Sequence, residues 1–214
     1  MEQGFGWQET YQQLAELGQG RELAPDDRGR GFVALGADGG VIAEFQPPPL
    51  LPVLGRSAED YLAAADRPGH HVLLLLQAGR TALGAFDDDE LLSHKVITKY
   101  VVRGKGRAQP THLASKGKSR YGSRLRLQNA RQQLVETNEK LIEYWQQHGA
   151  PRLIHHSVPV RTWPELFAVE PAPPFDRRDP GLHKVPIHVH PPSFEELKRV
   201  WRHLSRGRIV WRTG

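Results

Sequence analysis

The run HVLLLLQAGRTALGAF, residues 71–86, decides the fold. Residues 71–77 are almost continuously apolar, and residues 81–86 form a second, mainly apolar run. Ala78-Gly79-Arg80 between the two runs is a turn signal, so the stretch predicts two adjacent strands joined by a tight turn. The first run is short and holds no charged residue, which favours a buried strand over a membrane-spanning helix.

The sequence that follows predicts a third strand and then the longest helix of the chain. Residues 91–102 are typical of a strand, and a basic loop with several glycines runs from Arg103 to about Lys118. Residues 119–148 predict a helix, which Gly149-Ala150-Pro151 ends. The helix has an apolar stripe at helical spacing that we expect to be buried: Leu127, Ala130, Leu134, Leu141 and Trp145.

Shorter elements are predicted on both sides of this region. The expected strands are residues 32–35, 41–45, 152–158 and 209–211. The expected helices are residues 5–17, 57–65 and 193–204, together with one that begins at Thr162. Ser57, Thr162 and Ser193 are the expected N-terminal caps, Thr162 through a capping box with Glu165. Strands followed by alternating strands and helices indicate an α/β or α+β fold, a mixed β-sheet with flanking helices. We expect residues 1–24 to form an N-terminal helical extension and residues 25–214 to form one domain.

Positive charge is concentrated in one part of the chain. From Leu91 to Val135 there is no Asp or Glu, and this stretch contains eleven Lys or Arg residues. The whole chain has 29 basic and 24 acidic residues, so the remainder has 18 basic against 24 acidic residues and is net negative. A concentrated positive field attracts polyanions. Because a solvated lysine-rich surface usually mixes both signs, the segment predicts binding to nucleic acid.

The basic loop contains one uncharged amide side chain, that of Gln109, between Ala108 and Pro110. A glutamine cannot act as a general base, but it can orient a water molecule and hydrogen-bond a developing oxyanion. The helix that follows offers free N–H groups and the positive end of its dipole to an anion. The pattern therefore favours phosphate binding, and by itself it does not specify a reaction.

Several function classes are disfavoured by composition. The chain has no cysteine, which excludes disulfides and zinc–thiolate sites. The pairs His70-His71, His155-His156 and His188/His190 lack a third ligand at supporting spacing, so we expect no metal site. The acidic run 87–90 could bind a divalent cation but is more typical of a solvated turn. We see no signal peptide and no membrane-spanning run, and we expect a cytoplasmic protein.

Two short motifs resemble a known family. The first runs from His94 to Gln109 and includes Lys99-Tyr100-Val101-Val102-Arg103-Gly104-Lys105; the second is Tyr121-Gly122-Ser123 followed by Leu125-Arg126 and Asn129. Both resemble the central domain of the Vms/ANKZF-type ribosome quality-control hydrolases. That domain is similar to the middle domain of eukaryotic and archaeal class I release factors, which implies a ribonuclease-H-like mixed sheet for residues 25–214.

The resemblance implies a peptidyl-tRNA hydrolase that acts on stalled large ribosomal subunits. Gln109 occupies the position of the family's catalytic glutamine, although this chain has Arg107-Ala108-Gln109 where release factors have Gly-Gly-Gln. Large ribosomal subunits and peptidyl-tRNA are the implied partners of a monomer that needs no cofactor. The expected RNA-binding residues are Lys95, Lys99, Arg103, Lys105, Arg107, Lys116, Lys118, Arg120, Arg124 and Arg126. A nuclease of the tRNA acceptor end and a non-catalytic RNA-binding factor remain alternatives.

Overall fold

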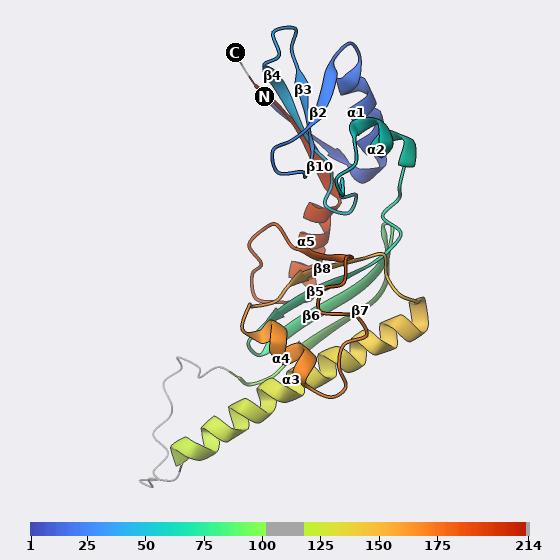
Figure 1. Cartoon of the computed structure of the whole chain (residues 1–214). Helices are drawn as coiled ribbons and strands as arrows, with labels where there is room; N and C mark the ends of the chain where they lie inside the picture. Colours follow the sequence, from blue (N-terminus) through green and yellow to red (C-terminus); the bar gives the residue numbers. More distant parts are fainter. Residues whose placement is uncertain (102–117, 213–214) are drawn as a thin grey trace. The chain divides into compact units, whose positions relative to one another are not determined.

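The computed structural model describes residues 1–101 and 118–212, and for residues 118–123 it describes the helical backbone alone. The chain divides into two compact units (Figure 1). Unit 1 combines residues 1–68 with residues 199–214, and unit 2 consists of residues 69–198. Each unit has its own sheet of five strands. No helix among the described residues combines the length and the apolar character needed to cross a bilayer.

Unit 1 is built on an antiparallel sheet that joins the two ends of the chain. In spatial order its strands are β1 (Glu2–Gly6), β10 (Arg206–Trp211), β4 (Val41–Gln46), β3 (Phe32–Leu35) and β2 (Glu22–Pro25). The helices of this unit are η1 (Trp7–Glu9), α1 (Thr10–Gly18) and α2 (Ala58–Ala64). Phe5, Phe32, Phe45 and Tyr61 form the centre of its core, and the Tyr61 hydroxyl donates a 2.7 Å hydrogen bond to the carbonyl of Leu51.

The N-terminal region differs from its predicted organisation. The helix expected over residues 5–17 begins at Thr10, because residues 2–6 form strand β1. Glu2 to Gly6 pair with residues 206–210 of β10, so residues 1–24 are part of unit 1 rather than a separate helical extension. The strand that completes this pairing is about 200 residues away in the sequence, and no local pattern reveals it.

Unit 2 contains the mixed sheet that residues 71–86 predict. Its spatial order is β7 (Glu90–Thr98), β6 (Arg80–Asp87), β5 (His70–Gln77), β8 (Leu153–Ser157) and β9 (Leu182–Lys184). The β5–β6 and β6–β7 pairs are antiparallel, whereas β8 runs parallel to both β5 and β9. Residues 72–76 of the central strand are fully buried, as expected of a strand that is covered on both faces. The third strand ends at Thr98 instead of residue 102.

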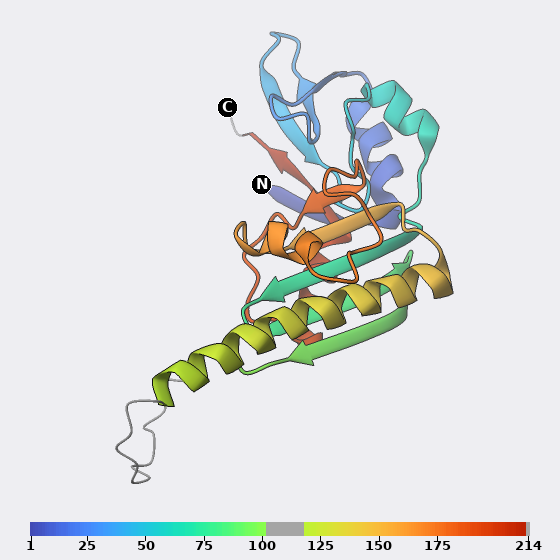
Figure 2. The ribbon, with the colours of Figure 1, turned by 60° about the horizontal axis from the view of Figure 1, so that its bottom comes forward.

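Helices cover both faces of this second sheet. The helices α3 (Lys118–His148) and α4 (Thr162–Ala168) lie against one face of the sheet (Figure 2). They contribute Leu134, Leu141 and Leu166 to a core with Leu74 and Leu83. Neighbouring residues of a strand point to opposite faces. Gly84 therefore faces the other side, where a Cβ atom would meet Leu197 of α5 (Phe194–Leu204) at 2.9 Å.

Two of the three predicted helix caps are present. The Ser57 and Ser193 hydroxyls accept hydrogen bonds from the backbone N–H groups of Asp60 and Glu196, at 3.0 and 3.1 Å. The expected capping box at Thr162 is wrong, because Thr162 already lies inside α4 and the N-cap is Arg161 without a side-chain hydrogen bond. A capping residue needs extended backbone angles, whereas Arg161 has φ −72° and ψ −32°.

Candidate nucleic-acid interface

The carboxyl ends of four strands lie at the same edge of the second sheet. Because β6 is antiparallel to both of its neighbours and β8 and β9 are parallel to β5, the strands β5, β7, β8 and β9 all run in the same direction. Their carboxyl ends therefore meet at a single edge. Ligands of open sheets with parallel strands bind outside this kind of edge. The chain leaves β7 here, at Thr98, before residues 102–117.

The buried amide of Gln133 on α3 holds the β5–β6 turn at this edge. Its Oε1 accepts a 2.9 Å hydrogen bond from the N–H of Gly79. Its Nε2 donates to the carbonyl of Gln77 and to the hydroxyl of Thr81, both at 2.9 Å. The side chain thus satisfies turn groups that would otherwise be buried without partners. The same three bonds fix the lengthwise position of α3 on the sheet.

The chain that leaves β7 is tied to both the turn and α3. The N–H of Lys99 donates to the carbonyl of Gly79 at 2.8 Å, and Nδ2 of Asn129 donates to the carbonyl of Tyr100 at 2.8 Å. Gly79 has φ +81°, and a Cβ atom there would lie 2.6 Å from the Lys99 carbonyl oxygen. Only glycine fits this position. Hydrogen bonds therefore link residues 99–101 both to the β5–β6 turn and to α3. We call residues 99–101 and α3 the connected base; in the sequence, residues 102–117 lie between its two parts.

The first turns of α3 project beyond this base. Residues 118–128 precede Asn129 and span about 16 Å at the usual helical rise, and Figures 1 and 2 show this projecting end extending past the strands. The expected burial of Leu127 is wrong, since its side chain is 72% exposed. The sheet has already ended at this level of the helix. On α3 the buried apolar stripe begins with Leu134 and continues through Leu141.

The structure describes four of the eleven predicted site residues with their side chains. Lys95 lies on β7 and Lys99 directly after it, while Arg124 and Arg126 lie on the projecting end of α3. The backbones of Lys118 and Arg120 are in α3, without described side chains. The remaining predicted site residues lie outside the described residues: Arg103, Lys105, Arg107, Gln109 and Lys116.

One predicted RNA-binding cation forms an ion pair with a residue of α3. Nζ of Lys99 lies 2.6 Å from a carboxylate oxygen of Glu136, with both side chains partly exposed. The Lys99 ammonium, which donates a hydrogen bond to this carboxylate, holds the pKa of Glu136 below its usual range. The hydrogen bond from Lys140 lowers the pKa of Glu143, and Lys95 makes a smaller contribution in the same direction to the pKa values of both Glu143 and Glu136. The basic segment therefore contains no carboxylate in its own sequence, but the carboxylates of Glu136 and Glu143, on the following turns of α3, lie close to its lysines.

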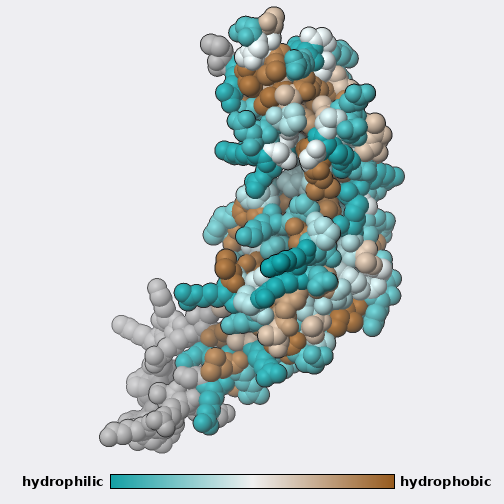
Figure 3. Space-filling model, viewed as in Figure 1, coloured by the Kyte–Doolittle hydropathy of each residue, from teal (hydrophilic) through white to brown (hydrophobic). Residues whose placement is uncertain are grey.

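Exposed apolar surface lies beside these cations. Val101, Leu127 and Ala130 line a hollow of about 370 Å³ together with Arg126, and the nearby Tyr100 side chain is 58% exposed. Figure 3 shows that hydrophilic residues cover much of the visible surface of unit 2. An aromatic ring and aliphatic side chains among cations can contact both bases and phosphates of a nucleic acid.

Sequence reasoning missed the polar residues that position α3. Gln133, Thr137 and Asn138 are all buried. Gln133 and Thr137 contact Thr81 of the sheet, whereas Asn138 donates 2.8 Å hydrogen bonds to the carbonyls of Leu166 and Pro171. Polar residues one turn apart within an apolar stripe were the available signal. Their hydrogen-bonding partners come from distant segments, so the pattern alone could not identify them.

The alternative sites considered from sequence are not assembled as metal centres. No group of three or more His, Asp or Glu residues could hold a metal ion within the described ranges 1–101 and 118–212. In the acidic run 87–90, Asp88 lies in the β6–β7 turn with φ +48°, and its carboxylate accepts a 2.8 Å hydrogen bond from the N–H of Gly69. Residues 88–89 form the turn itself, and Asp87 and Glu90 are the adjoining ends of β6 and β7.

The chain is similar to known proteins over most of its length. The model of the family "Bacteroidetes VLRF1 release factor" matches residues 71–211. Two curated relatives are each named "tRNA endonuclease ANKZF1", one from Mus musculus with 31% identity over 142 residues and one from Homo sapiens with 30% identity over 148 residues. Each match covers 64% of this chain and 19% of the relative, so the chain spans about a fifth of the length of these relatives.

A solved structure has a similar fold. It is described as "Vms1 mitochondrial localization core" and aligns with a TM-score of 0.53 and 12% identity, covering 94% of this chain and 84% of that one. At this identity the alignment supports the fold alone, and it agrees with the mixed α/β architecture described above. The family match rests on the sequence of unit 2 and the end of the chain. The chain belongs to the Bacteroidetes VLRF1 release factor family, within the Vms/ANKZF-type group of release-factor-like proteins.

Proposed function

We propose that this protein hydrolyses peptidyl-tRNA on stalled large ribosomal subunits during ribosome-associated quality control. Membership of a release factor family supports this proposal. The observation that carries it is the connected base of residues 99–101 and α3, with a basic helix end projecting from it. The segment between these two anchored points contains Gln109. A rigid base with a basic extension suits delivery of one loop residue into an RNA-lined site.

The proposed chemistry requires only water from outside the enzyme and its substrate. Water attacks the carbonyl carbon of the ester that links the peptide to the tRNA. The bond between this carbon and the ribose oxygen breaks, the proton from water passes to that oxygen, and the products are a free peptide carboxyl group and an intact tRNA. Gln109 orients the water and hydrogen-bonds the oxyanion that develops on the carbonyl. No cofactor takes part, and one copy of the chain in the cytoplasm suffices.

Gln109→Ala is the decisive test of this mechanism. We expect loss of peptide release by at least about 100-fold, with unchanged binding to large subunits, because oxyanion stabilisation contributes on this scale. The measurement is release of labelled peptide from large subunits that carry peptidyl-tRNA. Gln146→Ala is the matched control, since Gln146 is an exposed glutamine near the opposite end of α3. Equal release by the wild type and by Gln109→Ala would remove Gln109 from the mechanism.

The basic residues at the start of α3 are proposed to bind RNA phosphates. We expect Arg120→Glu with Arg124→Glu to weaken co-sedimentation with large subunits and to reduce the salt dependence of binding, because each phosphate contact releases counterions. Arg28→Glu with Arg30→Glu changes the net charge equally in an exposed turn of unit 1 and is the control. Co-sedimentation that is the same for the two double variants would argue against this RNA-binding face.

Cleavage of tRNA is the second candidate function, favoured by the name "tRNA endonuclease" that both curated relatives carry. A nuclease would leave a shortened tRNA, whereas ester hydrolysis leaves the tRNA intact. Gel analysis of the tRNA after the release assay distinguishes these reactions. A non-catalytic binding factor would sediment with subunits and release neither peptide nor a shortened tRNA.

A further inference from the structure

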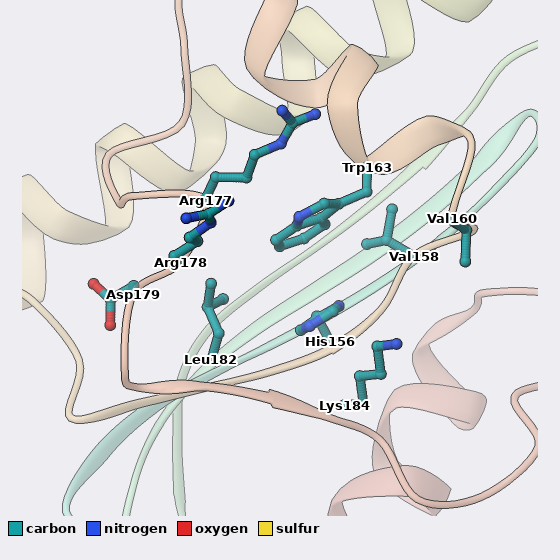
Figure 4. Close-up of a pocket in the computed structure, with 9 residues that line it drawn as sticks. All are labelled: His156, Val158, Val160, Trp163, Arg177, Arg178, Asp179, Leu182 and Lys184. Carbon is teal, nitrogen blue, oxygen red and sulfur yellow. The ribbon is translucent and has the colours of Figure 1, made fainter.

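Unit 2 contains a pocket at the carboxyl ends of β8 and β9, with a volume of about 390 Å³. It lies between the start of α4 and the loop of residues 176–181 (Figure 4). The nucleic-acid interface described above lies at the carboxyl ends of β5 and β7, so the pocket belongs to the same edge of the sheet. Its volume falls in the range of about 300–1,000 Å³ that is typical of small-molecule sites.

Three cationic side chains line this pocket. Arg177, Arg178 and Lys184 line it together with a single acid, Asp179. The Asp179 carboxylate accepts a 2.7 Å hydrogen bond from the N–H of Gly181, and Figure 4 shows it pointing away from the Trp163 ring. In the part of the chain that the structure describes, neither Arg178 nor Lys184 forms an ion pair with a carboxylate. These cations are available to an anion.

Most of the remaining lining is aromatic or aliphatic. Trp163, Val158 and Leu182 line the pocket, and Val160 at its margin is 81% exposed. The indole ring of Trp163 is held rigidly, because the His156 ring stacks on it at 4.4 Å and Phe167 meets its edge at 5.2 Å. Apolar surface that stays in water beside unpaired cations marks a site for a ligand with one apolar and one anionic part.

His156 adds a neutral polar group to the wall. It is only 9% exposed, and its Nδ1 is buried with no hydrogen-bond partner among the described residues. Burial, together with the nearby Lys184 ammonium, lowers the pKa of His156 to about 4. The ring is therefore neutral at pH 7 and offers one donor and one acceptor. The part of the His156 ring that faces the pocket therefore adds no positive charge to the wall.

We infer that this pocket holds a single nucleotide, with its phosphate on Arg178 and Lys184 and its base against the wall of Trp163 and Val158. A free carboxylate or inorganic phosphate would satisfy the cations but leave the apolar wall in water. A purely apolar ligand would leave the cations unused. The nucleotide is a residue of an RNA strand that has left its stack. The choice of an RNA residue over a free mononucleotide rests on the proposed function. The assignment of a nucleotide to this pocket does not depend on that function.

Charge reversal in the pocket tests this inference on the full chain. The probe is a fluorescein-labelled single-stranded hexaribonucleotide, and binding is followed by fluorescence anisotropy. We expect Arg178→Glu with Lys184→Glu to weaken binding about 10-fold or more, since phosphate contacts and base contacts are lost together. Arg28→Glu with Arg30→Glu, with the same change in net charge, is the control. All four side chains are exposed, so these variants should fold.

A second pair of variants tests the apolar wall. Val160→Glu places a carboxylate at the margin of the pocket, whereas Val96→Glu makes the same change at an exposed position of β7. We expect a several-fold loss of hexaribonucleotide binding for the first variant and a smaller one for the second. Equal effects in both pairs of variants would overturn the pocket assignment, because binding would then follow net charge alone.

AMP as the probe distinguishes the two sources of the nucleotide. AMP that binds at least about 10-fold more weakly than the hexaribonucleotide supports a site for a residue of an RNA strand. AMP that binds as tightly, with the same dependence on Arg178 and Lys184, would overturn the RNA assignment. Peptide release that depends on Gln109, in a protein whose pocket variants bind normally, would refute only the pocket. Pocket-dependent binding without peptide release would refute only the hydrolase.

Discussion

Gln133 is the residue on which the geometry of the candidate interface depends. Its amide makes three hydrogen bonds, to Gly79, Gln77 and Thr81, in a site where its own side chain is 2% exposed. A buried amide that loses its partner leaves polar groups unsatisfied, and each such group costs about 1–3 kcal/mol. Gln133 therefore contributes both to the stability of the fold and to the position of α3 on the sheet.

We predict that Gln133→Ala lowers the free energy of unfolding by about 2–4 kcal/mol, because the N–H of Gly79 and the carbonyl of Gln77 lose their partner. Urea denaturation followed by circular dichroism measures this. Gln128→Ala removes an exposed amide from the same helix and should stay within about 0.5 kcal/mol. Similar stabilities for the two variants would show that the turn does not depend on this amide.

The ion pair between Lys99 and Glu136 leads to a prediction about RNA affinity. Glu136→Gln frees the Lys99 ammonium for a phosphate, so we expect about threefold tighter binding of a single-stranded RNA at low salt and less effect at high salt. Glu139→Gln makes the same charge change at an exposed position of α3 that has no ion pair within the described residues. Equal gains for both variants would mean that Lys99 does not reach the RNA.

At the scale of the element, α3 has two parts with different roles. From Asn129 onward the helix is fixed to the sheet and buries Leu134 and Leu141, whereas residues 118–128 project past the strands. The sequence predicted the helix over residues 119–148, and it is found at Lys118–His148. Its apolar stripe could not show where the sheet ends, so burial at Leu127 was predicted although the side chain lies in solvent.

A matched pair of leucines tests this division of α3. Leu141→Ala should lower the free energy of unfolding by about 2–5 kcal/mol, because its side chain is fully buried and a cavity would remain. Leu127→Ala should change it by less than about 0.5 kcal/mol, since that side chain is 72% exposed. Both changes remove the same atoms from one helix, so thermal or urea denaturation compares position alone. A large loss for Leu127→Ala would place its side chain in a packed interface.

For the whole molecule, buried histidines make stability dependent on pH. Burial lowers the pKa of His155 to about 3 and those of His71 and His156 to about 4, all on the sheet of unit 2. Both ring nitrogens of His155 are buried without hydrogen-bond partners among the described residues. As pH falls, the unfolded chain takes up protons near pH 6.5, before the folded chain does. Stability is therefore complete above this pH and is lost between about pH 6.5 and pH 4.

We predict that the free energy of unfolding falls between pH 7 and pH 5, by about 1–2 kcal/mol for each of these histidines. Urea denaturation at the two pH values measures this. His155→Leu should show a smaller fall, because one proton fewer is taken up on unfolding. A wild-type protein equally stable at both pH values would contradict the burial of these rings as neutral groups.

Strong local patterns made several elements of the chain predictable. The hairpin of β5 and β6, the long helix and the capped helices α2 and α5 were expected to within a few residues, since their signals are local. The separate sheet of unit 1 was not expected. Its closure depends on the pairing of β1 with β10, and strands this far apart in sequence leave no mark on each other's local pattern.

By itself the sequence determined the mixed α/β character of the fold and the segment that carries the positive charge. It also determined the family, because the motifs that identify the family are local in the chain. Tertiary structure alone decided that Glu136 meets Lys99, that Gln133 holds the β5–β6 turn, and that Arg178, Lys184 and Trp163 line one pocket. These contacts join residues from separate elements. Their distances depend on how the strands and helices pack, which no local pattern specifies.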